Sequence, residues 1–192
     1  MKYTKKEIEE FLKESNAIED VHDEKSLKQA KIAWKYLESE PVLNSHVILK
    51  THKILMLHQK LWPNEKGYFR TVPVWVAGRE GLKHDKIRDA INEWVIDIET
   101  SIQVPGEDGK HIKFDHVTYE KIHPFVDGNG RTGRMFMNWE RMQADLPILI
   151  IHADWPNPKG EQVSYYSWFK QDDVDPEGMI DALMKLTKQV DK

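Results

Sequence analysis

The chain has 192 residues, of which 40% are hydrophobic and 31% are charged, with a formal net charge of −4. These values predict a single domain over residues 1–192 with a sizeable core, and they lack the basic footprint of a nucleic-acid binder. The absence of cysteine excludes disulfides, thiolate nucleophiles and thiolate zinc sites. No apolar run approaches the ~20 residues of a membrane helix, and residues 1–16 are too charged for a signal peptide, so we expect a cytoplasmic protein that does not contact membranes.

The N-terminal segment predicts a helix followed by a boundary. Residues 4–7, Thr-Lys-Lys-Glu, fit a capping box ahead of apolar residues at helical spacing. Residues 15–20, Ser-Asn-Ala-Ile-Glu-Asp, then have the pattern of a helix boundary, in which Glu19 is by itself a solvated charge. Ser15 and Glu19 are four residues apart, which places them on one helical face.

Two amphipathic helices are expected next, over residues 24–38 and 42–61, with Pro41 interrupting between them. The second carries histidines at positions 46, 52 and 58. At ~3.6 residues per turn a spacing of six scatters these rings around the helix, so we expect satisfied or exposed histidines and no metal site.

The middle of the chain alternates a β-rich segment with further helices. After a turn at residues 63–67, residues 68–77 contain alternating valines at 72, 74 and 76, which predicts a small edge hairpin. A third amphipathic helix is expected over residues 87–98 and another over residues 114–122, whose His116 we interpret as structural.

The chemistry of the chain is concentrated in residues 123–134, His-Pro-Phe-Val-Asp-Gly-Asn-Gly-Arg-Thr-Gly-Arg. A helix is expected over residues 131–144, so the glycine turn lies at its positive N-terminal end, where backbone N–H groups bind anions. Arg131 and Arg134 share a helix face and can both reach phosphate oxygens. Asp127 offers a hard oxygen ligand for Mg²⁺, and His123 can carry a proton near neutral pH. A Gly-Asn-Gly alone is usually a turn and a His-Pro-Phe alone is usually packing, but together these residues suit a metal-bound polyphosphate.

The C-terminal third predicts an apolar run at residues 147–151, a helix over residues 159–171 that contains Tyr165 and Tyr166, and a last helix from residue 175. The two tyrosines are equally compatible with a core position. The chain as a whole is expected to be mainly α, a single bundle with one short β-hairpin.

The segment 123–134 matches His-Pro-Phe-x-Asp/Glu-Gly-Asn-Gly-Arg-x-x-Arg at every fixed position, and the sequence resembles a Fic-domain protein from about residue 15 to residue 166. The resemblance implies a Fic-type helical bundle with an inhibitory helix at about residues 8–22, a flap at about residues 68–80 beside the active site, and the core motif at residues 123–134. It also implies transfer of AMP from ATP to a Tyr, Thr or Ser hydroxyl of a target protein, with release of pyrophosphate and with self-modification among the reactions.

The resemblance assigns a role to each motif residue. His123 is the base that takes the hydroxyl proton, and Asp127 holds Mg²⁺ between the α- and β-phosphates. The ATP-binding motif residues are Gly128, Asn129 at the α-phosphate, Gly130, Arg131 at the β-phosphate and Arg134 at the γ-phosphate. Phe125 anchors the loop, and Pro124 stiffens it.

Two further segments carry nucleotide contacts under the same resemblance. The flap residues Val74, Trp75, Val76 and Ala77 cover the nucleotide, and a loop of the target protein docks along them as an added strand. Tyr165 and Tyr166 resemble the paired tyrosines beside the adenine, whereas Asp173 stands where the family has an asparagine.

Residues 15–20 are similar to the inhibitory motif Ser/Thr-x-x-x-Glu-Gly/Asn of regulated Fic proteins, which implies that Ser15 and Glu19 control the enzyme. Glu19 is then expected to reach Arg134 and to occupy the space of the ATP γ-phosphate. Asp20 departs from the Gly or Asn of the motif, and its charge beside a carboxylate predicts weaker inhibition.

Several alternatives stay open at this point. Doc-like kinases carry a lysine where this chain has Gly128, which disfavours phosphate transfer. Relatives that transfer UMP or phosphocholine share the motif, and removal of AMP from a target with the help of Glu19 is a further reaction. A non-catalytic nucleotide- or partner-binding module is the alternative from another class, against which the intact His123 argues.

Overall fold

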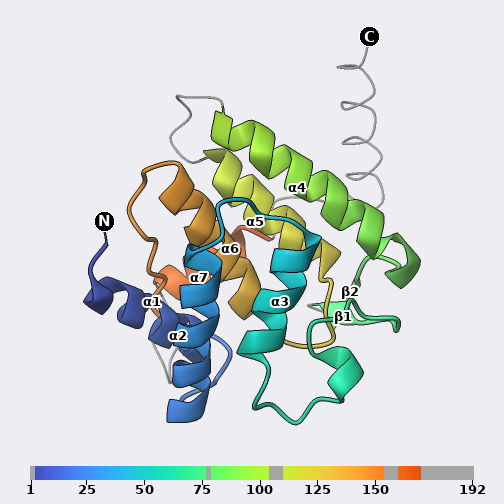
Figure 1. The fold of residues 1–192 in the computed structure, drawn as a ribbon, viewed down its shortest axis with the longest axis horizontal. Coiled ribbons are helices and arrows are strands. Elements are labelled where there is room, and N and C mark those ends of the chain that lie inside the picture. The colour runs from blue at the N-terminus through green and yellow to red at the C-terminus, as the bar shows by residue number, and fades with distance from the viewer. Residues whose placement is uncertain (1–2, 77–78, 104–109, 154–159, 170–192) are drawn as a thin grey trace.

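The computed structural model describes residues 3–76, 79–103, 110–153 and 160–169, and Figure 1 shows this part to be mainly helical. The α-helices are α1 (Lys5–Ala17), α2 (Glu24–Glu38), α3 (Ser45–Leu55), α4 (Ile87–Gln103), α5 (Lys110–Ile122), α6 (Asn129–Gln143) and α7 (Glu161–Ser167). Short 3₁₀ turns occur at Pro63–Glu65 and His84–Lys86, and two short strands are β1 (Trp75–Val76) and β2 (Arg79–Glu80). The helix expected from residue 175 lies outside the described residues.

The first two helices begin as their capping residues predict. Thr4 and Glu7 form the reciprocal capping box of α1, and the Asp23 side chain accepts from the Ser26 N–H to cap α2. The resemblance implied an inhibitory helix at about residues 8–22, whereas α1 covers Lys5–Ala17. A helix cannot continue through Asp20, whose φ of +56° lies in the left-handed region.

The α3 helix is shorter than the 42–61 segment expected from periodicity. It begins after Asn44, whose side chain accepts from the Val47 N–H, and it ends at Leu55. The interpretation of the histidines as satisfied or exposed is confirmed for His46, which is exposed, and for His52, which is buried with partners on both ring nitrogens. His58 bonds to Ser26 through Nε2, but its Nδ1 is buried without a partner among the described residues.

The β-rich segment forms much less strand than residues 68–77 predicted. Trp75 pairs with Glu80 and Val76 with Arg79 in an antiparallel register, while residues 77–78 lie outside the described part. Upstream, Pro73 has no N–H to donate, and the Arg70 N–H donates instead to the carbonyl of Pro124 (2.9 Å). These tertiary contacts remove the preceding residues from any strand pairing.

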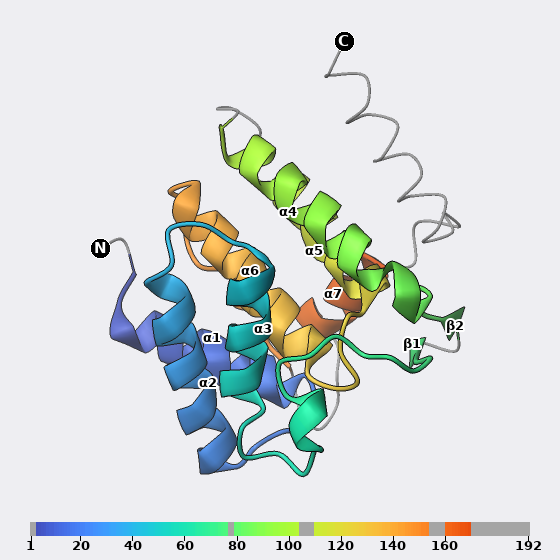
Figure 2. The same ribbon diagram turned by 45° about the vertical axis from the view of Figure 1, so that its right-hand side comes forward.

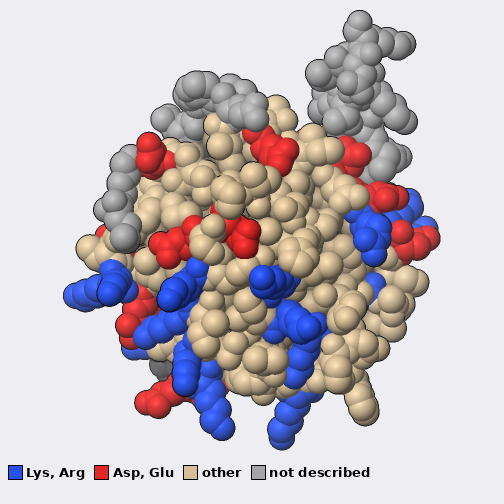
Figure 3. All heavy atoms as spheres, in the orientation of Figure 1, with Lys and Arg blue, Asp and Glu red and all other residues tan. Residues whose placement is uncertain are grey.

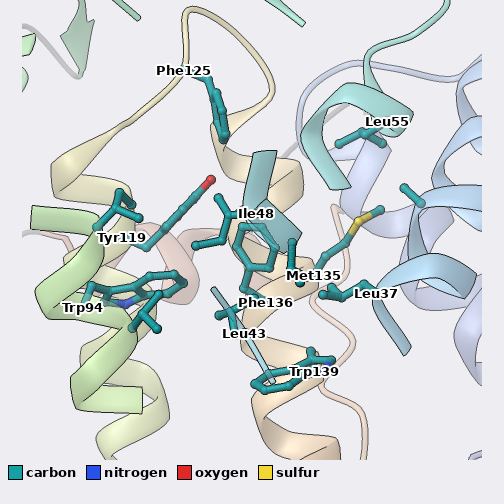
Figure 4. Close-up of a cluster of buried hydrophobic side chains, with 14 of the residues drawn as sticks. Leu37, Leu43, Ile48, Leu55, Trp94, Tyr119, Phe125, Met135, Phe136 and Trp139 are labelled. Atoms are coloured by element: carbon teal, nitrogen blue, oxygen red, sulfur yellow. The ribbon is translucent and has the colours of Figure 1, made fainter. Parts of the chain in front are cut away.

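The α6 helix is the central element of the bundle. Figures 1 and 2 show α4 and α5 side by side on one flank of it and α1 and α2 on another. The ten residues from Arg131 to Glu140 on α6 are all buried, as expected for a helix that is surrounded by others. Figure 4 shows the packing below the motif loop, where Trp94 and Tyr119 meet Phe136 with ring centroids 6.0 and 5.3 Å from it.

Charged side chains are unevenly spread over the surface. On the face in Figure 3, Lys and Arg gather over α2 and α3, whereas most Asp and Glu lie above them. Some of these cations have local partners: Lys31 pairs with Glu9 at 2.9 Å, and Lys50 lies over the Tyr36 ring at 4.3 Å. None of the helices in the described part is long and apolar enough to cross a lipid bilayer.

A buried acidic pair joins α5 to α6 and leads to a stability prediction. Asp115 and Glu140 are buried, with His111 Nε2 3.7 Å from Glu140 Oε1. Burial, followed by the charge of the partner carboxyl, raises the pKa of Glu140; burial likewise raises that of Asp115. The pair therefore retains protons in the folded state that the unfolded chain releases.

Acids with raised pKa values favour the folded state only at low pH, and that contribution is lost as pH rises through the folded pKa. We therefore expect the free energy of unfolding to fall between pH 5 and pH 9. Glu140→Gln should flatten this dependence and raise stability at pH 8 by about 1 kcal/mol or more, because an amide needs no proton to bond Asp115. Urea unfolding followed by circular dichroism measures the free energy of unfolding at each pH. The control is Glu99→Gln, on the exposed side of α4. An unchanged slope in Glu140→Gln would contradict the shared-proton interpretation.

Candidate nucleotide site at the start of the central helix

The motif forms the loop that joins α5 to α6, and its backbone has two unusual residues. Gly128 precedes α6 with φ +82°, and a Cβ built on it would lie 2.7 Å from Met56 Sδ. The left-handed conformation is what favours glycine here. His123 adopts φ +48°, which is costly for a residue with a Cβ and turns its side chain out of the α5 path.

Phe125 and Asn129 fix this loop from beneath. The Phe125 ring is fully buried and stacks on His52, with centroids 3.6 Å apart and planes 6° apart. The Asn129 side chain accepts from the Phe125 N–H (2.8 Å) and donates to the Phe125 carbonyl (2.9 Å). In this structure the Asn129 amide is directed into the loop and bonds to the Phe125 backbone through both its oxygen and its nitrogen.

His123 is oriented by the backbone of its own helix. Its Nδ1 lies 3.2 Å from the Glu120 carbonyl, which can only accept, so Nδ1 carries the proton and Nε2 has a free lone pair. Burial lowers the pKa of His123, which keeps the imidazole neutral at pH 7. A neutral ring with an unprotonated Nε2 is the form that a general base requires.

The Glu120 side chain lies behind the same ring. Its Oε2 is 3.9 Å from His123 Nδ1, and its Oε1 is buried without a hydrogen-bond partner among the described residues. Burial raises the pKa of Glu120 to about 8; the charge of Arg134 opposes this shift and the charge of Glu19 adds to it. Glu120 is therefore mostly protonated at pH 7.

The two motif arginines are buried, but only one has a hydrogen-bond partner on each of its three nitrogens among the described residues. Arg134 donates from Nε to the Ser15 hydroxyl (2.9 Å), from Nη1 to the Tyr165 hydroxyl (3.2 Å) and from Nη2 to the Ser15 carbonyl (2.9 Å). Arg131 is 3% exposed, and its Nε and Nη1 are buried without partners in the described part of the chain. Its Nη2 lies 3.6 Å from Asp127 Oδ1 and 3.4 Å from Met56 Sδ. Buried N–H groups without acceptors are costly, so this position suits an anionic ligand.

The carboxylate of Glu19 lies over the first turn of α6. Its Oε1 is 2.7 Å from Arg134 Nη2, and it is so close to Gly130 that a Cβ there would be 2.2 Å away. Burial alone would raise the pKa of Glu19, but the charge and hydrogen bond of Arg134 outweigh it and lower that pKa. An ionised carboxylate thus lies among the groups that would bind a phosphate.

Asp20 is directed toward a different partner. Its Oδ1 lies 3.1 Å from His22 Nε2, while its backbone has φ +56°. This conformation gives a physical reason why the related motif has Gly or Asn at this position, since these residues adopt it most readily. Aspartate tolerates it better than most other residues do.

The tyrosine pair and the β1 residues differ in their exposure to solvent. Tyr165 is buried, and its hydroxyl lies between Arg134 and His116 Nε2 (3.0 Å), so it supports an arginine instead of facing an open surface. Tyr166 is 43% exposed and Trp75 is 70% exposed. Val74 and Val76 lie in or beside β1, whereas Ala77 and Asp173 fall outside the described residues.

Sequence reasoning missed three residues that shape this site: His52, Met56 and Glu120. His52 Nε2 donates to the Asp127 carbonyl (2.9 Å) and its Nδ1 accepts from the Gly67 N–H (2.9 Å), which fixes its tautomer. The available signal was periodicity, because His52 and Met56 follow Ile48 at steps of four along the buried face of α3.

Asp127 is the residue that could hold a magnesium ion. Its side chain is 53% exposed at the mouth of the site, and Oδ1 accepts from the Gly128 N–H (2.6 Å). No group of three metal-ligating side chains gathers in the part of the chain described here. One protruding carboxylate fits Mg²⁺, which keeps several waters and takes its other ligands from substrate phosphates.

Comparisons with known proteins agree with this geometry. The family model Fic/DOC matches residues 43–140. Protein adenylyltransferase Fic from Nematostella vectensis is 32% identical over 114 residues, which cover 57% of this chain and 24% of the relative. The protein of the same name from Drosophila persimilis is 32% identical over 111 residues, or 56% of this chain and 20% of the relative. The chain therefore spans about a quarter or less of the length of these relatives.

Solved structures share the fold at low sequence identity. A Fic domain containing signaling protein from Bacteroides thetaiotaomicron aligns with a TM-score of 0.69 at 16% identity, covering 95% of this chain and 82% of that one. Fic-1 from C. elegans aligns with a TM-score of 0.65 at 16% identity, covering 97% and 65%. The expected mainly helical fold and the resemblance are both confirmed. Because the family model covers just over half of the 192 residues, including the whole loop motif at 123–134, the chain belongs to the Fic/DOC family.

Proposed function

We propose that this chain transfers AMP from ATP to a Tyr, Thr or Ser hydroxyl of a target protein and releases pyrophosphate. The observation that carries the proposal is the buried Arg131 guanidinium beside the N-terminus of α6, two of whose nitrogens have no acceptor among the described residues. A polyphosphate supplies several oxygens to such donors and is further favoured by the helix dipole. The relatives named protein adenylyltransferase Fic support AMP as the transferred group.

In this proposal the ATP phosphates lie on the backbone N–H groups of residues 128–130. Asn129 contributes its main-chain N–H, because its side chain is bound to Phe125. Arg131 binds the β-phosphate, and Arg134 binds the γ-phosphate once Glu19 has moved away. Position and charge stabilisation supply most of the catalysis in reactions of this type.

The transfer step uses the free lone pair of His123. Nε2 takes the proton of the target hydroxyl while its oxygen attacks the α-phosphorus, and the bond from that phosphorus to the bridging oxygen of pyrophosphate breaks. General-base assistance of this kind contributes about 10²–10⁴-fold in rate. A magnesium ion held by Asp127 would offset negative charge on the leaving pyrophosphate.

The segment around β1 is proposed to be the flap on which the target docks. Trp75 is exposed and Val74 is half-buried beside it, so this edge offers both main-chain groups and an apolar side chain to an extended peptide. We assign the exposed Tyr166 to the adenine side of the nucleotide and Tyr165 to support of Arg134. We also propose that Glu19 is inhibitory, because its carboxylate bonds to Arg134, the residue proposed to bind the γ-phosphate.

Transfer of the γ-phosphate, the reaction of Doc-like kinases, is the alternative to AMP transfer at this site. Incubation with α-labelled or γ-labelled ATP distinguishes the two: label retained only from the α-position indicates AMP transfer, and label only from the γ-position overturns the proposal. Glu19→Gly protein should be used beside the wild type so that inhibition does not hide activity.

The proposed role of Asp127 gives a metal prediction. Asp127→Asn keeps the size of the side chain but removes its charge, so the Mg²⁺ concentration for half-maximal AMP transfer should rise about tenfold or more. Titration of Mg²⁺ at fixed ATP measures this, with the exposed Asp89→Asn on α4 as the control. An unchanged Mg²⁺ requirement would show that Asp127 is not the ligand.

A further inference from the structure

Arg70 is a buried arginine, 3% exposed, whose guanidinium donates to main-chain carbonyls of three separate segments. Its Nε bonds to the His123 carbonyl (2.7 Å), and its Nη1 bonds to the Val72 carbonyl (2.9 Å). Its Nη2 bonds to the Leu82 carbonyl and, at 3.4 Å, to the Ile122 carbonyl. One rigid planar group therefore fixes the end of α5, the approach to β1 and the exit from β2.

The contact with His123 is made where the backbone is least relaxed. His123 has φ +48°, a conformation that persists only when surrounding contacts enforce it. Arg70 bonds to two successive carbonyls of the motif loop. Its side-chain Nε donates to the His123 carbonyl, and its backbone N–H donates to the Pro124 carbonyl (2.9 Å). The orientation of the proposed base therefore depends on Arg70.

The contacts with Val72 and Leu82 are made at the two ends of the segment that contains β1 and β2. The pairing within this segment continues at its base, where the Gly81 N–H donates to the Val74 carbonyl (2.9 Å). A peptide that added to this edge would shift these strands as a unit, and their ends are bonded to the same guanidinium as His123. The Arg70 guanidinium thus connects both ends of the β1–β2 segment directly to the His123 carbonyl.

We propose that Arg70 is a positioning residue that couples docking of an extended target peptide on the β1–β2 segment to the orientation of His123. This inference rests on the proposed function, because it assumes that His123 is the base and that the segment binds the target. Arg70 does not touch the reacting atoms. It acts through the His123 peptide group. When a target peptide is bound to the β1–β2 segment, Arg70 orients His123 so that Nε2 faces the hydroxyl that accepts AMP.

Lysine cannot replace this arrangement. An ammonium group is a compact point charge, whereas the guanidinium presents five N–H donors in a fixed plane to carbonyls that lie in different directions. Arg70→Lys therefore keeps the charge and removes the connection. Arg141→Lys is the matched control, because Arg141 also donates from Nε to a backbone carbonyl, that of Pro147 (2.7 Å), but on the distant part of α6.

The test measures AMP transfer in the Glu19→Gly background together with the imidazole NMR signals of His123. We expect Arg70→Lys to lower kcat by about 10–100-fold, the scale of a small misplacement of a catalytic group, with KM for ATP changed less than about twofold. The His123 imidazole signals should shift or broaden, while Arg141→Lys should change neither quantity. Circular dichroism and Tm establish that each variant is folded.

A second variant perturbs the connection without removing it. A Cβ on Gly81 would lie 3.3 Å from Arg70 Nη2 and 3.2 Å from Val74 Cγ2, so Gly81→Ala should displace the guanidinium slightly and give a smaller loss of kcat in the same direction. If Arg70→Lys does not fold, the kcat of Gly81→Ala tests the proposal in its place.

The proposal is overturned if kcat in Arg70→Lys stays within about twofold of Arg141→Lys, or if kcat falls while the His123 signals are unchanged. If no variant of this chain transfers AMP, the proposed function fails. The NMR comparison then still tests the connection, because perturbed His123 signals in Arg70→Lys support it and unperturbed signals refute it.

Discussion

His123→Ala should reduce AMP transfer by at least about 10²–10⁴-fold and leave ATP binding nearly intact. The His123 side chain is 20% exposed, its Nδ1 donates to the Glu120 carbonyl, and its Nε2 is left as an acceptor for the proton of the target hydroxyl. The groups proposed to bind the phosphates lie on residues 128–134 and do not depend on the imidazole. Mass spectrometry of Glu19→Gly protein should therefore detect AMP adducts only when His123 is present.

The control is His46→Ala, which removes an exposed histidine of α3 and should not affect transfer. Equal adducts in His123→Ala and His46→Ala would remove His123 from the mechanism.

The pH dependence gives an independent check on the same residue. Burial lowers the pKa of His123 below its ordinary value of 6.5, and a base acts only when it is unprotonated. The rate should therefore rise as pH increases through this lowered pKa and should already be near its plateau at pH 7. A rate that required pH above 7 to reach half its maximum would assign the titration to another group.

The motif was readable from sequence because each of its residues has a conformational or chemical property that is local. Gly128 needs a left-handed backbone, and the first turn of α6 has a positive end whatever surrounds it. Helix α2 was predicted at its observed bounds for the same reason, since its cap and its apolar period lie within the element.

The features that could not be predicted depend on contacts between distant segments. His52 Nε2 meets a carbonyl 75 residues away, and the Arg70 guanidinium reaches carbonyls 52 and 53 residues away. No periodicity within α3 or the β-rich segment encodes these partners. The strand expected over residues 68–77 was too long because the Arg70 backbone bonds to Pro124 instead of to a neighbouring strand.

The hydrogen-bond partners of the Asn129 side chain could not be predicted for a different reason. Its amide can bond to a phosphate or to the backbone equally well, and only the position of the Phe125 peptide group decides between them. Residue type alone therefore did not predict the bonds between the Asn129 side chain and the Phe125 backbone.

Glu19→Gly should raise the rate of auto-modification and of target labelling by about 5–150-fold, which corresponds to a coupling of ~1–3 kcal/mol between Glu19 and productive ATP binding. The Glu19 carboxylate lies 2.7 Å from Arg134 Nη2 and directly against Gly130. An ATP γ-phosphate that uses Arg134 must displace this charge-assisted bond or bind with its α-phosphorus out of line. Removing the carboxylate frees the guanidinium, while the Ser15 contacts with its Nε and Nη2 remain to hold it in place.

The neighbouring Asp20 allows the mechanism to be separated from simple loosening of the turn. Asp20→Gly relieves a φ of +56° and removes a charge that bonds to His22, so it should keep the turn in place and leave inhibition intact or strengthen it. Glu19→Gln should activate the enzyme almost as much as Glu19→Gly, because the uncharged amide cannot form the ion pair with Arg134. The glutamine keeps the size of the side chain, so this variant separates the effect of charge from that of occupied space. If Glu19→Gly activates and Glu19→Gln does not, occupancy of the space above Gly130 is the inhibitory element and the charge is secondary. If neither variant exceeds the wild-type rate at equal protein and ATP, the contact between Glu19 and Arg134 only packs α1 against α6, and inhibition by this segment is refuted.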